Sequence, residues 1–129
     1  MELRTISITV ARPVKVVYEY LAAPEKYSEW SFFLTSARPE GDRWIFETPN
    51  GPVHVKFVER NAYGVLDHWV TVGGDAAIYV PLRVVAHGHE SAVLFTVFRQ
   101  SEMSDQDYDA DIAAVRKDLE NLKRVLESA

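Results

Sequence analysis

The sequence contains no cysteine among its 129 residues. This absence excludes disulfides, thiolate metal ligands and a cysteine nucleophile. Positive charge is also scarce, because 14 Lys and Arg residues stand against 19 Asp and Glu residues, giving a formal net charge of -5. Nucleic-acid binding depends on clustered Lys and Arg, so we expect no nucleic-acid partner.

Long apolar runs are missing as well. No segment approaches the roughly 20 apolar residues that span a bilayer, so we expect no membrane insertion. The N-terminal residues lack the basic-then-apolar pattern of a signal peptide, and the expectation is a cytoplasmic protein. The content of 47% hydrophobic and 26% charged residues is typical of one globular domain, here residues 1–129.

Three elements are predicted at the start of the chain. Residues 3–10 alternate apolar and polar side chains, which is typical of a strand. Pro13 suits the first position of a helix, and the apolar side chains in residues 14–21 have helical spacing. Pro24 ends that helix, and residues 24–30 are predicted to form a second short one.

The middle of the chain has the pattern of a β-sheet. Short runs of β-branched and aromatic residues are separated by Gly, Pro, Asn and Asp. Short connections of this kind join neighbouring strands into antiparallel hairpins. The predicted strands are residues 32–38, 43–48, 53–59, 65–72, 77–87 and 91–100.

The strongest helix signal lies at the C-terminal end of the sequence. Ser104, with Asp107 three residues later, forms an N-terminal capping pattern. One side of this helix is an apolar stripe that must be buried, and the sheet is the only large partner for it. The stripe consists of Tyr108, Ile112, Val115, Leu119, Leu122 and Leu126.

Centring each hairpin on its turn predicts how the strands pair. All four hairpins then place apolar residues on one face, which we expect to contact the C-terminal helix. A slip of one residue would invert that face. The predicted cross-strand partners are Phe46 with Val55, Val55 with His68, His68 with Leu82, and Leu82 with Phe95.

The opposite face is only partly polar. Asp67 and Arg83 are predicted to form an ion pair at the surface, where such pairs contribute little stability. Trp69, Tyr79 and Phe98 share this face. A contiguous group of exposed aromatic residues would indicate a partner, and homodimerisation through this face is a hypothesis.

A family resemblance is carried by residues 6–13, 14–21, 23–30, 66–70, 81–84 and 95–99 and by the C-terminal helix. With the order of elements, these segments resemble the START-like superfamily, also called SRPBCC and including polyketide cyclase/dehydrase-like proteins, and within it a small bacterial branch. The resemblance implies an α+β helix-grip fold, in which a curved antiparallel sheet of about seven strands wraps the long helix around a cavity. Family ligands are mostly apolar, and no catalytic set can be transferred to this chain.

His68 is the ionisable residue that the predicted pairing places in the middle of the apolar face. An imidazole in a cavity could orient the polar end of a ligand or act as a general acid or base near neutral pH. The alternative is a histidine that is packed in the core and hydrogen bonded there. His68 is therefore the candidate for both ligand binding and catalysis.

Other candidate ligand-binding residues follow from the same face and from the elements that cover it. Arg99 could bind a ligand carboxylate, or it could pair with Asp105 or Asp109 at the start of the final helix. The remaining candidates are Tyr27, Trp30, Phe46, Val55, Leu82, Phe95, Tyr108 and Ile112.

Metal and cofactor sites are not expected. His87 and His89 flank a turn, but only Glu90 is near them in the sequence, and metal sites require three or four ligands. The sequence has no Gly-rich phosphate-binding loop of either common kind.

Three functions remain open. The first is binding of a small hydrophobic or aromatic ligand, by a carrier, sensor or chaperone, in a cavity between the sheet and the C-terminal helix. The second is a cofactor-independent cyclase or dehydratase acting on a polyketide-like substrate. The third is a protein-interaction domain whose core is filled by side chains.

Overall fold

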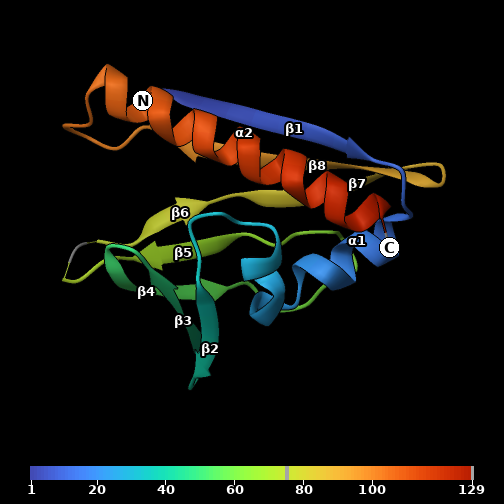
Figure 1. Cartoon of the computed structure of the whole chain (residues 1–129), viewed down its shortest axis with the longest axis horizontal. Helices are drawn as coiled ribbons and strands as arrows, with labels where there is room; N and C mark the ends of the chain where they lie inside the picture. Colours follow the sequence, from blue (N-terminus) through green and yellow to red (C-terminus); the bar gives the residue numbers. More distant parts are fainter. Residues whose placement is uncertain (75, 129) are drawn as a thin grey trace.

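The computed structural model describes residues 1–74 and 76–128, and it forms an α+β fold in which antiparallel strands wrap around a long C-terminal helix (Figure 1). The predicted architecture is therefore confirmed. The elements are β1 (Leu3–Val10), α1 (Val14–Leu21), the 3-10 helix η1 (Pro24–Glu29), β2 (Ser36–Glu40), β3 (Arg43–Thr48), β4 (Gly51–Phe57), β5 (His68–Thr71), β6 (Ile78–Val80), β7 (Leu82–His87), β8 (Glu90–Phe98) and α2 (Asp105–Glu127).

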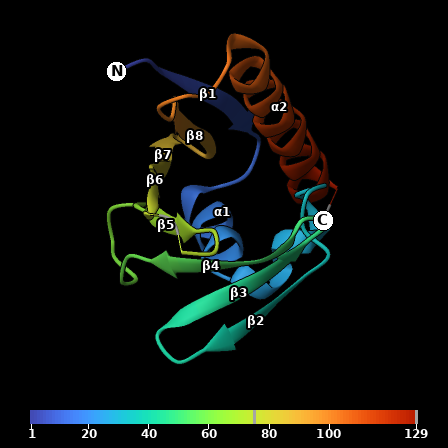
Figure 2. The ribbon, with the colours of Figure 1, turned by 90° about the vertical axis from the view of Figure 1, so that its left-hand side faces the viewer.

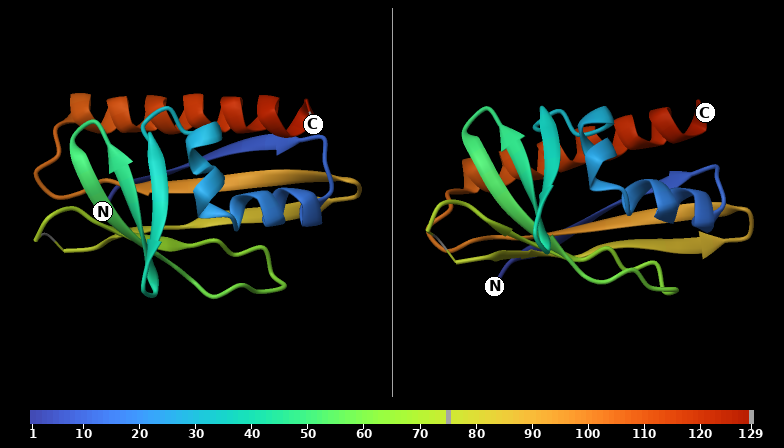
Figure 3. Two further views of the ribbon diagram at one scale, coloured as in Figure 1. Left: turned by 60° about the horizontal axis from the view of Figure 1, so that its bottom comes forward. Right: turned by 90° about the horizontal axis from the view of Figure 1, so that it is seen from below.

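The strands form two sheets, with the orders β1-β8-β7 and β2-β3-β4-β5-β6. Helix α2 packs against β1, while the five-stranded sheet lies across the interior from it (Figure 2). Strands β2, β3 and β4 cross the direction of β7 and β8 steeply (Figure 3). The eight strands thus enclose the interior from several sides.

Pro81 explains why eight strands are present rather than about seven. The strand predicted for residues 77–87 is interrupted at this residue, which has no backbone N–H to donate. Its carbonyl still accepts a hydrogen bond from Thr96 N at 3.0 Å. On the β6 side of Pro81, no described backbone hydrogen bond joins β6 to β8. The two sheets therefore separate at Pro81.

Asp67 holds the chain at this divergence. Its carboxylate accepts hydrogen bonds from Leu82 N at 3.0 Å, from Tyr79 Oη at 2.5 Å and from Arg83 Nη2 at 2.9 Å. The Asp67 side chain is only 6% exposed, whereas that of Arg83 is 51% exposed. The predicted ion pair exists, but the prediction of a surface pair is wrong for its acidic member, which is buried.

Helix α2 begins as predicted. Ser104 Oγ accepts a hydrogen bond from Asp107 N at 3.0 Å, and the predicted apolar stripe is buried except for half-buried Val115. The far end of the helix is tied to β1 and the residue after it. Lys123 Nζ donates to Thr9 O at 2.7 Å, and Ala11 N donates to Glu127 Oε2 at 2.8 Å.

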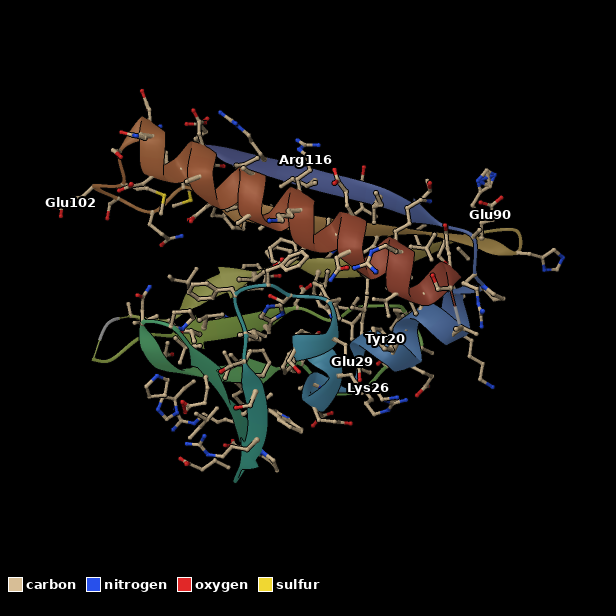
Figure 4. The ribbon with its side chains drawn as sticks, viewed as in Figure 1. Tyr20, Lys26, Glu29, Glu90, Glu102 and Arg116 are labelled. Atoms are coloured by element: carbon tan, nitrogen blue, oxygen red, sulfur yellow. The ribbon has the colours of Figure 1, made fainter. Side chains whose placement is uncertain are left out.

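The short helix predicted at residues 24–30 is present as the 3-10 helix η1, and it is tied to α1. Tyr20 Oη donates to Glu29 Oε1 at 2.8 Å, and Lys26 Nζ lies 5.8 Å from the centroid of the Tyr20 ring (Figure 4). The strand predicted for residues 32–38 begins only at Ser36, because the segment before it turns toward α2. There Phe32 N donates to Asp118 Oδ1 at 3.0 Å.

Three of the four predicted strand registers are wrong by two residues. The observed partners are Phe46 with Val53, Val55 with Val70, and His68 with Val80, whereas Leu82 pairs with Phe95 as predicted. A shift by two residues keeps each side chain on the same face, because side chains alternate along a strand. The apolar face was therefore identified correctly from incorrect pairs.

Removing the Asp67 carboxylate should destabilise the protein strongly. Asp67→Ala leaves the buried Leu82 N–H without an acceptor, and we expect the free energy of unfolding to fall by roughly 2–3 kcal/mol in urea denaturation followed by circular dichroism. Arg83→Ala is the control, and it should cost at most about 1 kcal/mol because Arg83 is half exposed. Equal losses in the two variants would contradict this role of Asp67.

Candidate ligand-binding cavity

A cavity of about 480 Å³ lies between α2 and the sheets. Its walls are contributed by η1 and the segment after it, by β3 to β6, by β8 and by the middle of α2. Most of the lining side chains are aliphatic or aromatic, because the inward face of each strand is the apolar one. The structure thus has an apolar interior space of the size that small ligands occupy.

Six of the ten candidate residues line this cavity. They come from η1, from the residue that follows it, and from four different strands, so the fold brings together positions far apart in the sequence. The six residues are Tyr27, Trp30, Phe46, Val55, His68 and Phe95.

Three further candidates lie in the core outside the cavity wall. Leu82 is fully buried on β7, past the bend at Pro81. Tyr108 and Ile112 are buried on α2, and Tyr108 Oη donates to Val97 O at 2.7 Å. Arg4 of β1 lies 5.2 Å from the centroid of the Tyr108 ring, so this side of α2 faces β1 and β8 rather than the cavity.

Arg99 is also outside the cavity. Its Nη1 forms ion pairs with Asp105 at 2.7 Å and Glu2 at 3.0 Å, and its Nη2 donates to Met103 O at 2.8 Å. Of the two alternatives for this residue, pairing with the start of the final helix is the one observed. Arg99 therefore ties the last strand to α2.

His68 lies in the cavity wall, where one ring nitrogen forms a hydrogen bond and the other has no described partner. Nδ1 is 3.0 Å from Leu66 O, so it carries the proton and donates, and Nε2 bears the lone pair. No described group forms a hydrogen bond with Nε2. Burial lowers the pKa of His68, and the bond to Leu66 and the charge of Asp67 oppose this effect only in part. His68 therefore offers the cavity a neutral hydrogen-bond acceptor.

Aromatic side chains surround this imidazole. The ring centroids of Phe57 and Phe95 lie 4.9 Å and 6.4 Å from that of His68. Tyr27 packs against Trp30 at 4.9 Å, and its hydroxyl donates to Leu21 O at 2.7 Å. Burial raises the pKa of Tyr27, so this wall stays uncharged. Tyr27 thus serves the cavity as an apolar surface.

Two carboxylates in the wall were missed by the sequence reasoning. Asp111 and Asp118 are on α2, seven residues apart, and share the side of the helix that carries Ala114 and Val115. The apolar stripe gave no sign of them, because they lie beside the stripe rather than in it. Burial raises the pKa of Asp118, and burial together with nearby Asp107 raises that of Asp111.

One side of the cavity lies where β6 and β8 diverge. Val72, Tyr79, Thr96, Phe98 and Gln100 belong to its lining, although alternation directs several of these side chains to the outer face. They can reach the cavity there because no described hydrogen bond closes the space between the two strands. The facing edges of β6 and β8, which do not pair with each other, therefore form part of its rim.

The outer face near this rim carries an aromatic cluster. The rings of Trp69 and Tyr79 are 5.3 Å apart, and those of Tyr79 and Phe98 are 6.2 Å apart. Trp69 is 38% exposed and Tyr79 is 36% exposed. The aromatic residues expected on this face are thus contiguous, and homodimerisation through them stays a prediction.

The described residues also bear on two other kinds of site. None of the helices among them has both the length and the apolar character needed to cross a membrane. In the same part of the chain, no three His, Asp or Glu side chains are grouped so that they could hold a metal ion.

Comparison with known proteins identifies the fold. No protein-family model and no curated protein sequence matches this chain. Among solved structures, the Aha1 dimer from Colwellia psychrerythraea matches with a TM-score of 0.78 and 15% identity over 98% of this chain and 97% of that chain. A START superfamily protein from Mycobacterium smegmatis matches with a TM-score of 0.77 and 8% identity over 98% and 97% of the two chains.

A third similar structure is StfQ, a di-domain ARO/CYC from the steffimycin biosynthetic pathway. It matches with a TM-score of 0.72 and 10% identity over 96% of this chain and 44% of that chain. At these identities the matches show the fold alone. The chain has the START-like, helix-grip fold, as the sequence resemblance implied.

The neutral state of His68 should make stability depend on pH. In the unfolded chain His68 takes up a proton near its ordinary pKa of about 6.5, whereas the folded protein resists this until lower pH. As the pH falls, His68 is therefore protonated in the unfolded state at a higher pH than in the folded state, which stabilises the unfolded state. The stability advantage of wild type over His68→Gln should therefore shrink between about pH 7.5 and about pH 5 in urea titrations.

The control for this measurement is His87→Gln, which changes an exposed histidine at the end of β7. The change with pH should be larger for His68→Gln than for this variant, whose side chain is exposed in the folded protein. Equal changes in the two variants would show that burial does not keep His68 neutral.

Proposed function

We propose that this protein binds a small apolar molecule carrying a hydrogen-bond donor, such as a hydroxyl group, in the cavity between α2 and the sheets. The observation that carries the proposal is the unpaired Nε2 of His68 in an apolar cavity of about 480 Å³. This nitrogen lines the cavity without a described partner, so a ligand donor can form a hydrogen bond with it there.

The size of the cavity supports ligand binding over a purely structural role. Small-molecule sites occupy roughly 300–1,000 Å³ and combine apolar walls with a few polar groups. A protein-interaction domain with a filled core would not leave a space of this size, because protein interiors are close-packed. The apolar walls supply affinity, and His68 supplies orientation.

Catalysis by a cyclase or dehydratase is the second candidate. It is favoured by the free Nε2 of His68, which is a potential general base, and by the raised pKa of the Asp118 carboxyl in the α2 wall. The fold of StfQ, described as an ARO/CYC, is consistent with such chemistry. Chromatography coupled to mass spectrometry of a compound incubated with the protein separates the two functions: a carrier returns its ligand unchanged, a dehydratase lowers its mass by one water, and a cyclase changes its retention even where the mass is kept.

The role of His68 can be tested with 2-naphthol and naphthalene, which differ by one hydroxyl group. A hydrogen bond contributes about 0.5–1.5 kcal/mol. The preference for 2-naphthol over naphthalene should therefore be roughly 2–10-fold greater in wild type than in His68→Phe, measured as the ratio of dissociation constants from tryptophan fluorescence titrations.

Phe95→Leu is the matched control, since it alters an apolar part of the same wall. It should weaken both compounds by similar factors and leave the wild-type preference intact. An unchanged preference in His68→Phe would contradict the assignment of Nε2 as the acceptor. If neither compound binds to the wild-type protein, the cavity is not a site for ligands of this type.

A further inference from the structure

The charged groups in the cavity wall are all of one sign. Asp111 and Asp118 contribute carboxylates from α2, whereas the described wall contains no Lys or Arg. Arg99, the cation expected there, is held outside by Glu2 and Asp105. His68 adds no positive charge, because burial keeps its imidazole neutral. The wall therefore opposes a bound anion and favours a bound cation.

The two carboxylates have the geometry of a pair along one side of a helix. Seven residues of α-helix place them about 10 Å apart, facing the same way. Asp118 accepts hydrogen bonds from Ser31 Oγ at 2.9 Å and Phe32 N at 3.0 Å, which fix its position. Lys117 lies over the Phe32 ring and forms no described ion pair with Asp118, although its charge lowers the pKa of that carboxyl and so partly opposes the effect of burial.

The hydrogen-bonding groups of the wall are also mostly acceptors. Ser31 donates to Asp118, Gln100 Nε2 donates to Phe98 O, and Tyr27 donates to Leu21 O, so these donors are already used. The Nε1 of Trp30 has no described partner, but it is buried. Nε2 of His68 remains as an acceptor across the cavity from α2. A ligand that complements this wall therefore carries hydrogen-bond donors.

Resting on the proposed function, we propose that the ligand is an apolar amine, whose protonated nitrogen pairs with the Asp118 carboxylate, whose second stabilising charge is Asp111 two helical turns away, and whose apolar body lies against the aromatic side of the cavity. Apolar carboxylates such as fatty acids are excluded by the same charges. This selectivity follows from side chains on one helix, and it is independent of the hydrogen bond at His68.

Three compounds with the same chain but different head groups test this inference. Dodecylamine, dodecanol and dodecanoate are titrated below their micelle-forming concentrations, with displacement of Nile red as the readout. We expect dodecylamine to bind roughly fivefold tighter than dodecanol, because a partly buried ion pair adds to the shared apolar contact. Dodecanoate should bind most weakly.

Matched variants separate the site from the overall negative charge of the protein. Asp118→Asn and Asp111→Asn should each reduce the advantage of dodecylamine over dodecanol by about half or more. Glu120→Gln removes the same charge from an exposed position on α2 and should leave the advantage unchanged. Circular dichroism checks that each variant is folded.

The outcomes distinguish this inference from the proposed function. If dodecanol binds but dodecylamine binds no tighter, or if Glu120→Gln acts like Asp118→Asn, the amine assignment is wrong while the cavity still binds ligands. If dodecanoate binds as tightly as dodecylamine, the charge argument is wrong. If Nile red does not bind and none of the three compounds does, both proposals are wrong.

Discussion

Between β6 and β7 the chain passes through Pro81, whose backbone has no N–H to donate, and the surrounding structure accommodates this residue with a single buried carboxylate. Asp67 bonds to the Leu82 N–H just after the proline and to the side chains of Tyr79 and Arg83 on either side of it. Burial would raise the pKa of Asp67, but these hydrogen bonds together lower it. The bend is therefore held by a charged group that stays ionised at neutral pH, and the cavity lies inside this bend.

In the cavity wall, the hydrogen-bond acceptor of His68 is surrounded by apolar side chains. His68 is fixed by its bond to Leu66 and by packing against Phe57, so its free nitrogen has a defined position before any ligand binds. Preorganisation of this kind reduces the entropy lost on binding. The carboxylate of Asp118 is likewise positioned by the segment that follows η1. Under the proposed function, specificity would come from His68 and Asp118, which are held by backbone groups in different parts of the cavity wall.

Patterns with a short range were readable from the sequence, whereas long-range contacts were not. The Ser104 cap and the stripe on α2 depend on residues three or four apart, and both were predicted. The apolar face survived a two-residue error in register because alternation has a period of two. The cavity side of α2 was missed, since Asp111 and Asp118 look like solvent-exposed acids in the sequence. Which side of α2 faces β1 is decided by tertiary packing, as the contact between Arg4 and Tyr108 shows.

The divergence of β6 and β8 has a mechanical consequence. The last described backbone bond between the two sheets on this side joins Thr96 N to Pro81 O, and beyond it β6 and β8 meet through side chains, including the stacked rings of Tyr79 and Phe98. Moving β6 away from β8 would separate the stacked rings of Tyr79 and Phe98 but break no described backbone–backbone hydrogen bond, whereas undocking α2 would break the side-chain bonds of Lys123 to Thr9 and of Glu127 to Ala11. On this side the cavity wall is therefore closed by side-chain packing rather than by a continuous backbone ladder.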